Sequence, residues 1–310
     1  MKKVTVVGAG NVGATCANVL AHMDVVKHVV LLDIQGDFAK GKALDTWQQA
    51  PIDSYSTYLT GTSDYADTAG SDIVVITAGV PRKPGMTRDD LVATNAKIVA
   101  SVVENIVKHS KNPIIIVVSN PLDVMTYAAF KKAGLKSSRV IGMAGILDTA
   151  RYRAFLATEL NVSPKDIQAI LMGGHGDTMV PLPRYTTVSG IPVTELISKE
   201  KLDAIVARTK DGGGELVRLM GTSAWYAPGA AAAQMVEAIV KDEQRIFPCC
   251  VMLNGQYGIK GFPVGVPVKL GKNGIEKIIT LKLRKEEKEL LASSAKAVKD
   301  VCAVYDGMNL

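Results

Sequence analysis

A glycine-rich segment near the N-terminus places the tightest constraint on how this chain can fold. The segment follows the apolar run Val4–Val7 and precedes an apolar helical pattern through Cys16 and Leu20. It consists of Gly8, Ala9, Gly10, Asn11, Val12 and Gly13. Its first glycine permits a tight turn, the second lets the backbone approach a pyrophosphate, and the third lets the helix pack closely on the strand. The segment predicts a dinucleotide-binding βαβ unit with the phosphates at the helix N-terminus.

An acidic residue closes the second predicted strand. Asp33 lies 20 residues after Gly13 and directly follows the run Val29–Leu32. Its carboxylate would accept hydrogen bonds from an adenosine ribose and repel a 2′-phosphate, and residues 34–36 supply no compensating cation. The pattern favours NAD over NADP. A structural turn with an incidental aspartate is the alternative.

Short apolar runs alternate with helical patterns through the first 144 residues. They are Val4–Val7, Val29–Leu32, Ile73–Thr77, Ile114–Val118 and Val140–Met143. These β-branched, nearly uninterrupted runs are typical of parallel strands buried on both faces. Ile98, Val102 and Ile106 recur at helical spacing and predict an amphipathic helix between two of the runs. Residues 1–144 therefore predict an α/β fold, a Rossmann-type doubly wound parallel sheet.

The pattern changes from about residue 145 to longer helices mixed with shorter strand candidates. The expected helices cover 148–159, 201–220, 229–243 and 285–305, and the expected strands cover 250–253, 266–270 and 276–283. Residues 145–310 therefore predict a second, α+β domain for the substrate. The run Gly212–Gly214 predicts a distortion in the second of these helices. Because no Pro/Ser-rich linker separates the halves, we expect them to share an interface.

Composition excludes several classes of protein. With 47% hydrophobic and 21% charged residues and no repeats, the 310-residue chain is expected to be globular rather than disordered. No apolar run approaches the roughly 18 residues of a membrane span. Lysines and arginines are dispersed without interleaved aromatics, which argues against nucleic-acid binding. The net charge of +6 is explained equally by solubility and by attraction of an anionic metabolite.

The cysteines bear on the cell compartment. The chain has four of them: Cys16, Cys249, Cys250 and Cys302. Their spacing matches neither a zinc site nor a disulfide framework. A reducing cytoplasm is therefore the expected location.

Two loops that follow predicted strands carry polar groups suited to ligands. Asn120 ends the run Ile114–Val118, at the sheet edge where open α/β sheets bind ligands, although an ordinary turn asparagine fits equally. The Pro- and Gly-containing segment 81–88 carries Arg82 and Arg88. It is interpreted either as a loop that closes over a small anion or as a solvated basic loop.

Two further segments combine a carboxylate, a guanidinium and an imidazole. Asp148 and Arg151 lie three residues apart at the start of a predicted helix, where an exposed ion pair is the usual explanation. His175 is surrounded by three glycines and is therefore accessible to a ligand. Together with a dinucleotide site, these groups match the requirements of hydride transfer on a hydroxy acid.

These motifs, in this order, resemble the lactate/malate dehydrogenase family over essentially the whole chain, most closely its malate-type members built on the lactate-dehydrogenase plan. The resemblance implies reversible oxidation of (S)-malate to oxaloacetate with NAD, no metal, and a homodimer or homotetramer. It implies that His175 exchanges the hydroxyl proton and that Asp148 orients its ring. Lactate or broader 2-hydroxy-acid oxidation is the alternative activity, and an inactive NAD-binding regulatory module is the alternative class.

The resemblance also implies substrate and cofactor contacts. Arg88 would polarise the C2 carbonyl, Arg151 would hold the C1 carboxylate, and Arg82 would meet the second carboxylate. Ser223 would lie in the substrate pocket, and Asn120 would touch both substrate and cofactor. Further cofactor contacts are implied for Asn95, Val118 and Ser119.

Overall fold

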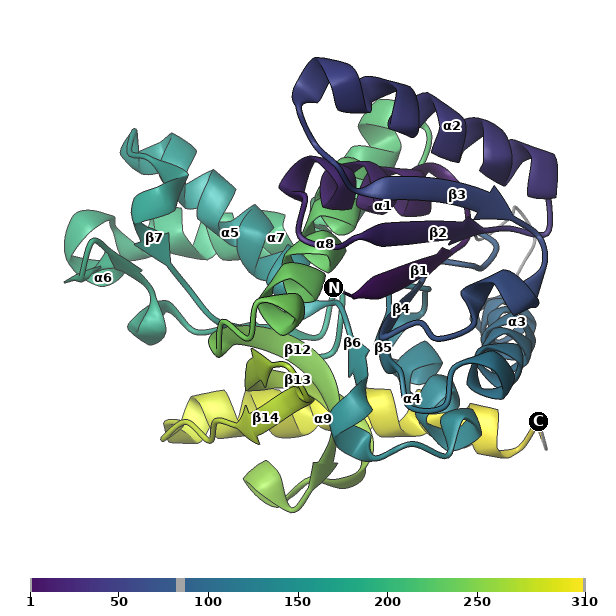
Figure 1. Cartoon of the computed structure of the whole chain (residues 1–310). Helices are drawn as coiled ribbons and strands as arrows, with labels where there is room; N and C mark the ends of the chain where they lie inside the picture. The colour runs from purple at the N-terminus through teal and green to yellow at the C-terminus, as the bar shows by residue number, and fades with distance from the viewer. Residues whose placement is uncertain (1, 82–86, 309–310) are drawn as a thin grey trace.

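The computed structural model describes residues 2–81 and 87–308, and only the backbone of Arg88. The first half forms a parallel sheet in the order β3-β2-β1-β4-β5-β6 (Figure 1). Its strands are β1 (Lys3–Val7), β2 (His28–Leu32), β3 (Tyr58–Thr62), β4 (Ile73–Ile76), β5 (Ile114–Val117) and β6 (Val140–Gly142). Its helices are α1 (Asn11–Met23), α2 (Gly36–Asp53), α3 (Arg88–His109) and α4 (Leu122–Ala133). This arrangement confirms the predicted doubly wound sheet and adds β3.

Both faces of this sheet are buried, as the uninterrupted apolar runs predict. Val6 belongs to the core that contains Leu20 of α1, whereas its neighbour Val7 belongs to the core that contains Val99 of α3. Successive strand residues therefore face opposite helix layers. The loops after β1, β4 and β5 open at one edge of the sheet, which is where α/β folds bind ligands.

The sheet continues into the second half through antiparallel strands. β12 (Arg245–Asn254) pairs with β6 and with β13 (Lys260–Gly271). The other strands that extend this sheet are β8 (Leu171–Gly173), β9 (Met179–Pro181) and β14 (Gly274–Ile278). A separate small sheet joins β7 (Ile167–Gln168), β10 (Thr187–Val188) and β11 (Ile191–Pro192). The two halves thus share an interface, as expected.

Long helices surround these strands. They are α5 (Gly145–Leu160), α7 (Lys199–Met220), α8 (Tyr226–Val240) and α9 (Lys285–Asp306), with the short α6 (Val193–Leu196). α8 packs on α1, and α9 packs on α3 and α4. Short 3-10 turns occur at η1 (Tyr65–Thr68), η2 (Ser137–Arg139), η3 (Pro164–Asp166), η4 (Pro183–Tyr185) and η5 (Gln256–Gly258). Within residues 2–81 and 87–308, the helices are too short or too polar to cross a bilayer.

The expected distortion at Gly212–Gly214 is wrong, because α7 runs unbroken through these residues. A Cβ added at Gly212 would lie 3.1 Å from Cδ of Arg151, so the glycine lets α7 lie close to the side chains of α5. α8 begins at Tyr226, earlier than expected. Pro228 therefore lies in its first turn, where the missing N–H leaves no helical bond unmade.

Candidate active site

The glycine-rich turn between β1 and α1 has the geometry of a dinucleotide cradle. Gly8 adopts φ +102°, a conformation that other residues rarely take. A Cβ at Gly13 would lie 1.8 Å from the carbonyl oxygen of Gly8, so α1 approaches the turn as only glycine permits. A Cβ at Gly10 would meet nothing within 4 Å. The turn is therefore closed on the sheet side and open where a pyrophosphate would approach.

Asp33 lies beside this turn and is held by it. Its Oδ2 accepts the N–H of Ala9 at 2.7 Å, and its Oδ1 accepts the N–H of Gln35 at 2.9 Å. The carboxylate lines the same cavity as the turn. It is thus fixed at the end of β2, the position from which a ribose is recognised.

The turn and Asp33 border a cavity of about 530 Å³. Asn11 and Val12 also line it, and residues 222–225 of the second half close one wall. Ile34 is 93% exposed on its rim and offers an apolar surface for a flat base. The size, the open glycine turn and the fixed carboxylate together fit NAD.

A second cavity of about 280 Å³ adjoins the first, because Val12, Ser223 and Ala224 line both. It gathers residues that lie far apart in the sequence. Its predicted polar members are Asn120, Arg151, His175 and Ser223. The structure therefore brings these four predicted residues to one place beside the dinucleotide cavity, whereas the predicted contacts of Arg82 and Arg88 stay predictions.

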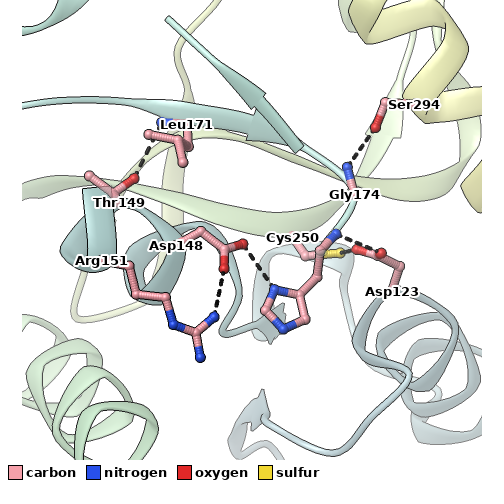
Figure 2. A network of polar contacts seen from close by, with 9 residues as sticks. Asp123, Asp148, Thr149, Arg151, Leu171, Gly174, Cys250 and Ser294 are labelled. Atoms are coloured by element: carbon pink, nitrogen blue, oxygen red, sulfur yellow. Dashed lines mark hydrogen bonds and ion pairs between the residues drawn. The ribbon is translucent and has the colours of Figure 1, made fainter. Parts of the chain in front are cut away.

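His175 and Asp148 form a hydrogen-bonded pair at this cavity (Figure 2). Nδ1 of His175 lies 2.9 Å from Oδ2 of Asp148, whose side chain is only 2% exposed. Burial alone lowers the pKa of His175, but the charge and hydrogen bond of Asp148, helped by the charge of Asp123, hold this pKa above its usual value. Nε2 has no hydrogen-bond partner among the described residues, so it is free to meet a ligand.

Arg151 presents an incompletely bonded guanidinium to the same cavity. Its Nη1 lies 3.4 Å from Oδ1 of Asp148, and its side chain is 14% exposed. Nε is buried and lacks a partner within the described part of the chain. Burial lowers the pKa of Arg151, and the charge of Asp148 opposes this shift. A buried cation with an unsatisfied donor is suited to bind an anion.

Neighbouring strands and helices set the position of these groups. Thr149 Oγ1 accepts the N–H of Leu171 at 3.2 Å, which ties α5 to β8 (Figure 2). Gly145, at the start of α5, packs so closely on Pro248 of β12 that a Cβ would lie 2.8 Å from Cβ of Pro248. α5 is thus fixed against β12 and against β8, the strand that leads to His175.

The other predicted residues occupy supporting places. Asn95 is buried. Its side-chain Oδ1 accepts a hydrogen bond from the N–H of Val80 at 2.8 Å, and its Nδ2 donates one to the carbonyl oxygen of Asn120 at 2.7 Å. Ser119 donates to the carbonyl of Ala78 at 2.6 Å. Asn95 therefore joins the ends of β4 and β5, and its direct contact with a cofactor stays a prediction.

The remaining predictions concern the smaller cavity and the loop after β4. Val118 lines the smaller cavity. Arg88 begins α3, behind a capping box formed by Thr87 and Asp90. Arg82 lies outside the described residues.

Sequence reasoning missed two contributions to the site. Gly213, Gly214 and Val217 of α7 line the smaller cavity, so the glycine run belongs to the site rather than to a helix break. Asp123 of α4 bonds the backbone of His175. The glycine run was visible in the sequence, whereas nothing local marks Asp123 because its partner lies 52 residues away.

Comparison with known families agrees with this geometry. Residues 2–142 match the NAD-binding domain of lactate/malate dehydrogenases, and residues 146–304 match their alpha/beta C-terminal domain. This chain belongs to the lactate/malate dehydrogenase family. Family membership confirms the predicted NAD-binding Rossmann domain followed by a second domain of helices and strands, which was expected as α+β and which the family describes as alpha/beta.

Individual family members are similar over nearly their full length. The chain is 67% identical over 307 residues to malate dehydrogenase from Cytophaga hutchinsonii, covering 99% of this chain and 98% of that protein. The 1.55 Å resolution structure of malate dehydrogenase from Salinibacter ruber superimposes with a TM-score of 0.96 at 54% identity, covering 99% of this chain and 98% of that chain. A Cryptosporidium parvum lactate dehydrogenase bound to lactic acid and NAD gives a TM-score of 0.94 at 38% identity, covering 98% of both chains.

Proposed function

We propose that this chain is an NAD-dependent malate dehydrogenase that interconverts (S)-malate and oxaloacetate. The observation that carries the proposal is the smaller cavity, where the imidazole of His175, whose Nε2 has no partner among the described residues, and the largely buried guanidinium of Arg151 lie beside a dinucleotide cavity. A 2-hydroxy acid offers a hydroxyl to the first group and a carboxylate to the second. The 67% identity to a malate dehydrogenase favours malate within this substrate class.

His175 carries the proton in this proposal. In malate oxidation its Nε2 accepts the proton of the C2 hydroxyl, and in oxaloacetate reduction it returns that proton. Asp148 accepts the Nδ1–H, which fixes the tautomer, and its charge stabilises the protonated ring. Because Asp148 is almost fully buried, its charge acts on the ring with little screening by water.

The substrate is held by cations and amides. Arg151 binds the C1 carboxylate through two parallel hydrogen bonds, and only Nη1 of its guanidinium has a hydrogen-bond partner among the described residues. Asn120 donates its amide to substrate and cofactor, and Ser223 lines the pocket. Arg88 polarises the C2 carbonyl, and Arg82 pairs with the second carboxylate; these two assignments rest on the family resemblance.

The cofactor is held mainly by the first half. The pyrophosphate lies on the turn formed by Gly8, Ala9, Gly10, Asn11, Val12 and Gly13. Asp33 binds the ribose, and Val118, Ser119, Asn120 and Asn95 shape the nicotinamide end. When bound, NAD supplies the two-electron redox chemistry. The chain supplies orientation, charge and the exchange of the proton.

The proposal extends to organisation and location. We place the boundary between the NAD-binding and substrate domains at residues 144 and 145, between β6 and α5. A homodimer or homotetramer is supported by the exposed apolar side chains of Phe38, Leu44 and Ile52 on α2. A reducing cytoplasm is supported by the four cysteines, which are all free and buried.

Initial rates with NADH test the proposed activity. The specificity constant for oxaloacetate should exceed that for pyruvate by at least about a hundredfold. Pyruvate lacks the second carboxylate, so its binding would leave the cation proposed to pair with that group, Arg82, enclosed and unpaired. His175→Asn should bind NADH normally but lose nearly all turnover. Preference for pyruvate would reassign the enzyme to lactate, and absence of turnover with both substrates would favour the regulatory module.

A further inference from the structure

The loop that carries His175 is held by side chains from two helices. The N–H of Gly174 donates to Oγ of Ser294 on α9 at 2.8 Å. The N–H of His175 donates to Oδ2 of Asp123 on α4 at 3.0 Å (Figure 2). Two consecutive backbone groups are thus tied to different helices, so the loop is fixed from both sides.

Each oxygen of the Asp123 carboxylate accepts one hydrogen bond, and these bonds oppose the rise in the pKa of Asp123 that its burial causes. Its Oδ1 accepts a hydrogen bond from the thiol of Cys250 at 3.2 Å, and its Oδ2 accepts the hydrogen bond from the N–H of His175. Burial raises the pKa of the Cys250 thiol, which therefore stays protonated and able to donate. A Cβ added at Gly174 would lie 3.2 Å from Oδ2, so the loop passes tightly over the carboxylate. β12, α4 and the loop meet at this one group.

We propose that Asp123 is a positioning residue for proton transfer, one that holds the backbone of His175 so that the ring meets Asp148 and turns Nε2 toward the substrate cavity. The proposal rests on the proposed function, because it requires His175 to exchange the substrate proton. With the N–H fixed by Asp123 and Nδ1 fixed by Asp148, the direction of Nε2 is determined from both ends of the residue. A small misplacement of a reacting group lowers a rate steeply.

The position of Asp123 also affects the charge balance at the ring. From α5, Asp148 raises and Arg151 lowers the pKa of His175, and from α4 the charge of Asp123 raises it. Asp177, on the loop itself, lines the cavity behind the ring together with Asp123. Against that cavity α9 places apolar side chains such as Val298, and β12 contributes the neutral Cys250 thiol, which contacts Asp123 rather than the ring.

Asp123→Asn separates positioning from folding. The amide keeps the volume of the side chain and one acceptor oxygen but loses the charge. We expect kcat for oxaloacetate reduction to fall at least about tenfold, with the KM for NADH changed less than twofold. Reduction requires protonated His175, and loss of a charge that raises its pKa makes kcat/KM for oxaloacetate decline at lower pH than in the wild type.

Ser294→Ala is the matched control, because it removes the neighbouring anchor without changing any charge. It should leave the pH midpoint where the wild type has it. The proposal is overturned if Asp123→Asn has wild-type kcat and pH midpoint, if its kcat falls with an unshifted midpoint, or if it no longer binds NADH. In the last two cases Asp123 acts only on the fold.

The cavity behind the ring allows a second test. It measures about 350 Å³ and is lined by Asp123, His175 and Asp177. Asp123→Ala should enlarge it, and added formate should restore kcat several-fold in this variant but in neither the wild type nor Ser294→Ala. Absence of rescue in an NADH-binding Asp123→Ala contradicts a role for the carboxylate. Turnover in His175→Asn would instead refute the proposed function itself, whereas an inactive His175→Asn beside an unaffected Asp123→Asn refutes only the positioning role.

Discussion

Two glycines of the β1–α1 turn have different reasons to lack a side chain, and alanine substitutions should separate them. In Gly13→Ala the new methyl would lie 1.8 Å from the carbonyl oxygen of Gly8, and neither atom can rotate away, because the methyl is bonded directly to the α1 backbone and the oxygen is a backbone atom. Relief requires α1 to move away from β1 by more than an ångström. Such overpacking costs about 3 kcal/mol, of which the better helix propensity of alanine offsets about 1 kcal/mol. A net loss of about 2 kcal/mol lowers Tm by about 4 °C in a chain of this size.

Gly10→Ala is the control, because its methyl would meet nothing within 4 Å and its φ of −64° suits alanine. Replacing this N-cap glycine costs at most about 1 kcal/mol of stability. The methyl instead projects into the space where the pyrophosphate approaches the backbone. The Kd for NADH should therefore rise at least tenfold, equivalent to about 1.4 kcal/mol.

Thermal melts without cofactor and NADH fluorescence titrations measure the two effects separately. Gly13→Ala should show the larger loss of Tm, and Gly10→Ala should lose NADH affinity with a nearly unchanged Tm. If Gly13→Ala melts at or above the wild-type temperature, the close approach of α1 does not limit packing. If Gly10→Ala binds NADH as the wild type does, the pyrophosphate does not lie on this turn.

Three further predictions concern the chemistry. Asp148→Asn should lower the raised pKa of His175. The kcat/KM for oxaloacetate reduction should then fall to half its maximum at lower pH than in the wild type, and an unshifted pH profile would contradict the coupling of His175 to Asp148. The wild type should prefer NADH to NADPH, and Asp33→Ser should narrow the difference in specificity constants; equal constants in the wild type would refute the role of the carboxylate. Arg82→Gln should collapse the ratio of oxaloacetate to pyruvate specificity constants, whereas collapse in Lys83→Gln alone would identify the neighbouring cation instead.

The sequence predicts those elements whose signal is local. Apart from Lys3 at the start of β1, the strands β1 and β4 are continuous β-branched runs because both of their faces are buried. β3 escapes notice because only Leu59 and Thr62 of its five residues are buried. A Cβ at Gly61 would lie 2.2 Å from the backbone of Ala39. Glycine is therefore required at this position because α2 packs directly against the strand. That requirement is tertiary and leaves no periodic pattern.

The residues of the site also fall into those with a local sequence signal and those whose role depends on tertiary contacts. The glycine-rich segment 8–13 and the three glycines around His175 are local sequence patterns. The structure then brings His175 together with Asp148 and Arg151. The distortion predicted at Gly212 is wrong because helix propensity disfavours glycine inside a helix, whereas here the absence of a side chain makes room for Arg151. Asp123 gives no local signal, since its role depends on a backbone group of a loop from the other half.

The strand pairing across the middle of the chain limits how this enzyme can be recombined. A fragment ending at residue 144 would expose β6 as an open edge, because β12, its antiparallel neighbour, would be missing. It would also lose α8, whose Gly229 approaches α1 so closely that a Cβ would lie 2.7 Å from Thr15, and α9, which covers α3 and α4. A chimera that takes its cofactor preference from another family member must therefore exchange the β1–α1 and β2–α2 loops in place, because the N-terminal half cannot be transplanted as a cassette.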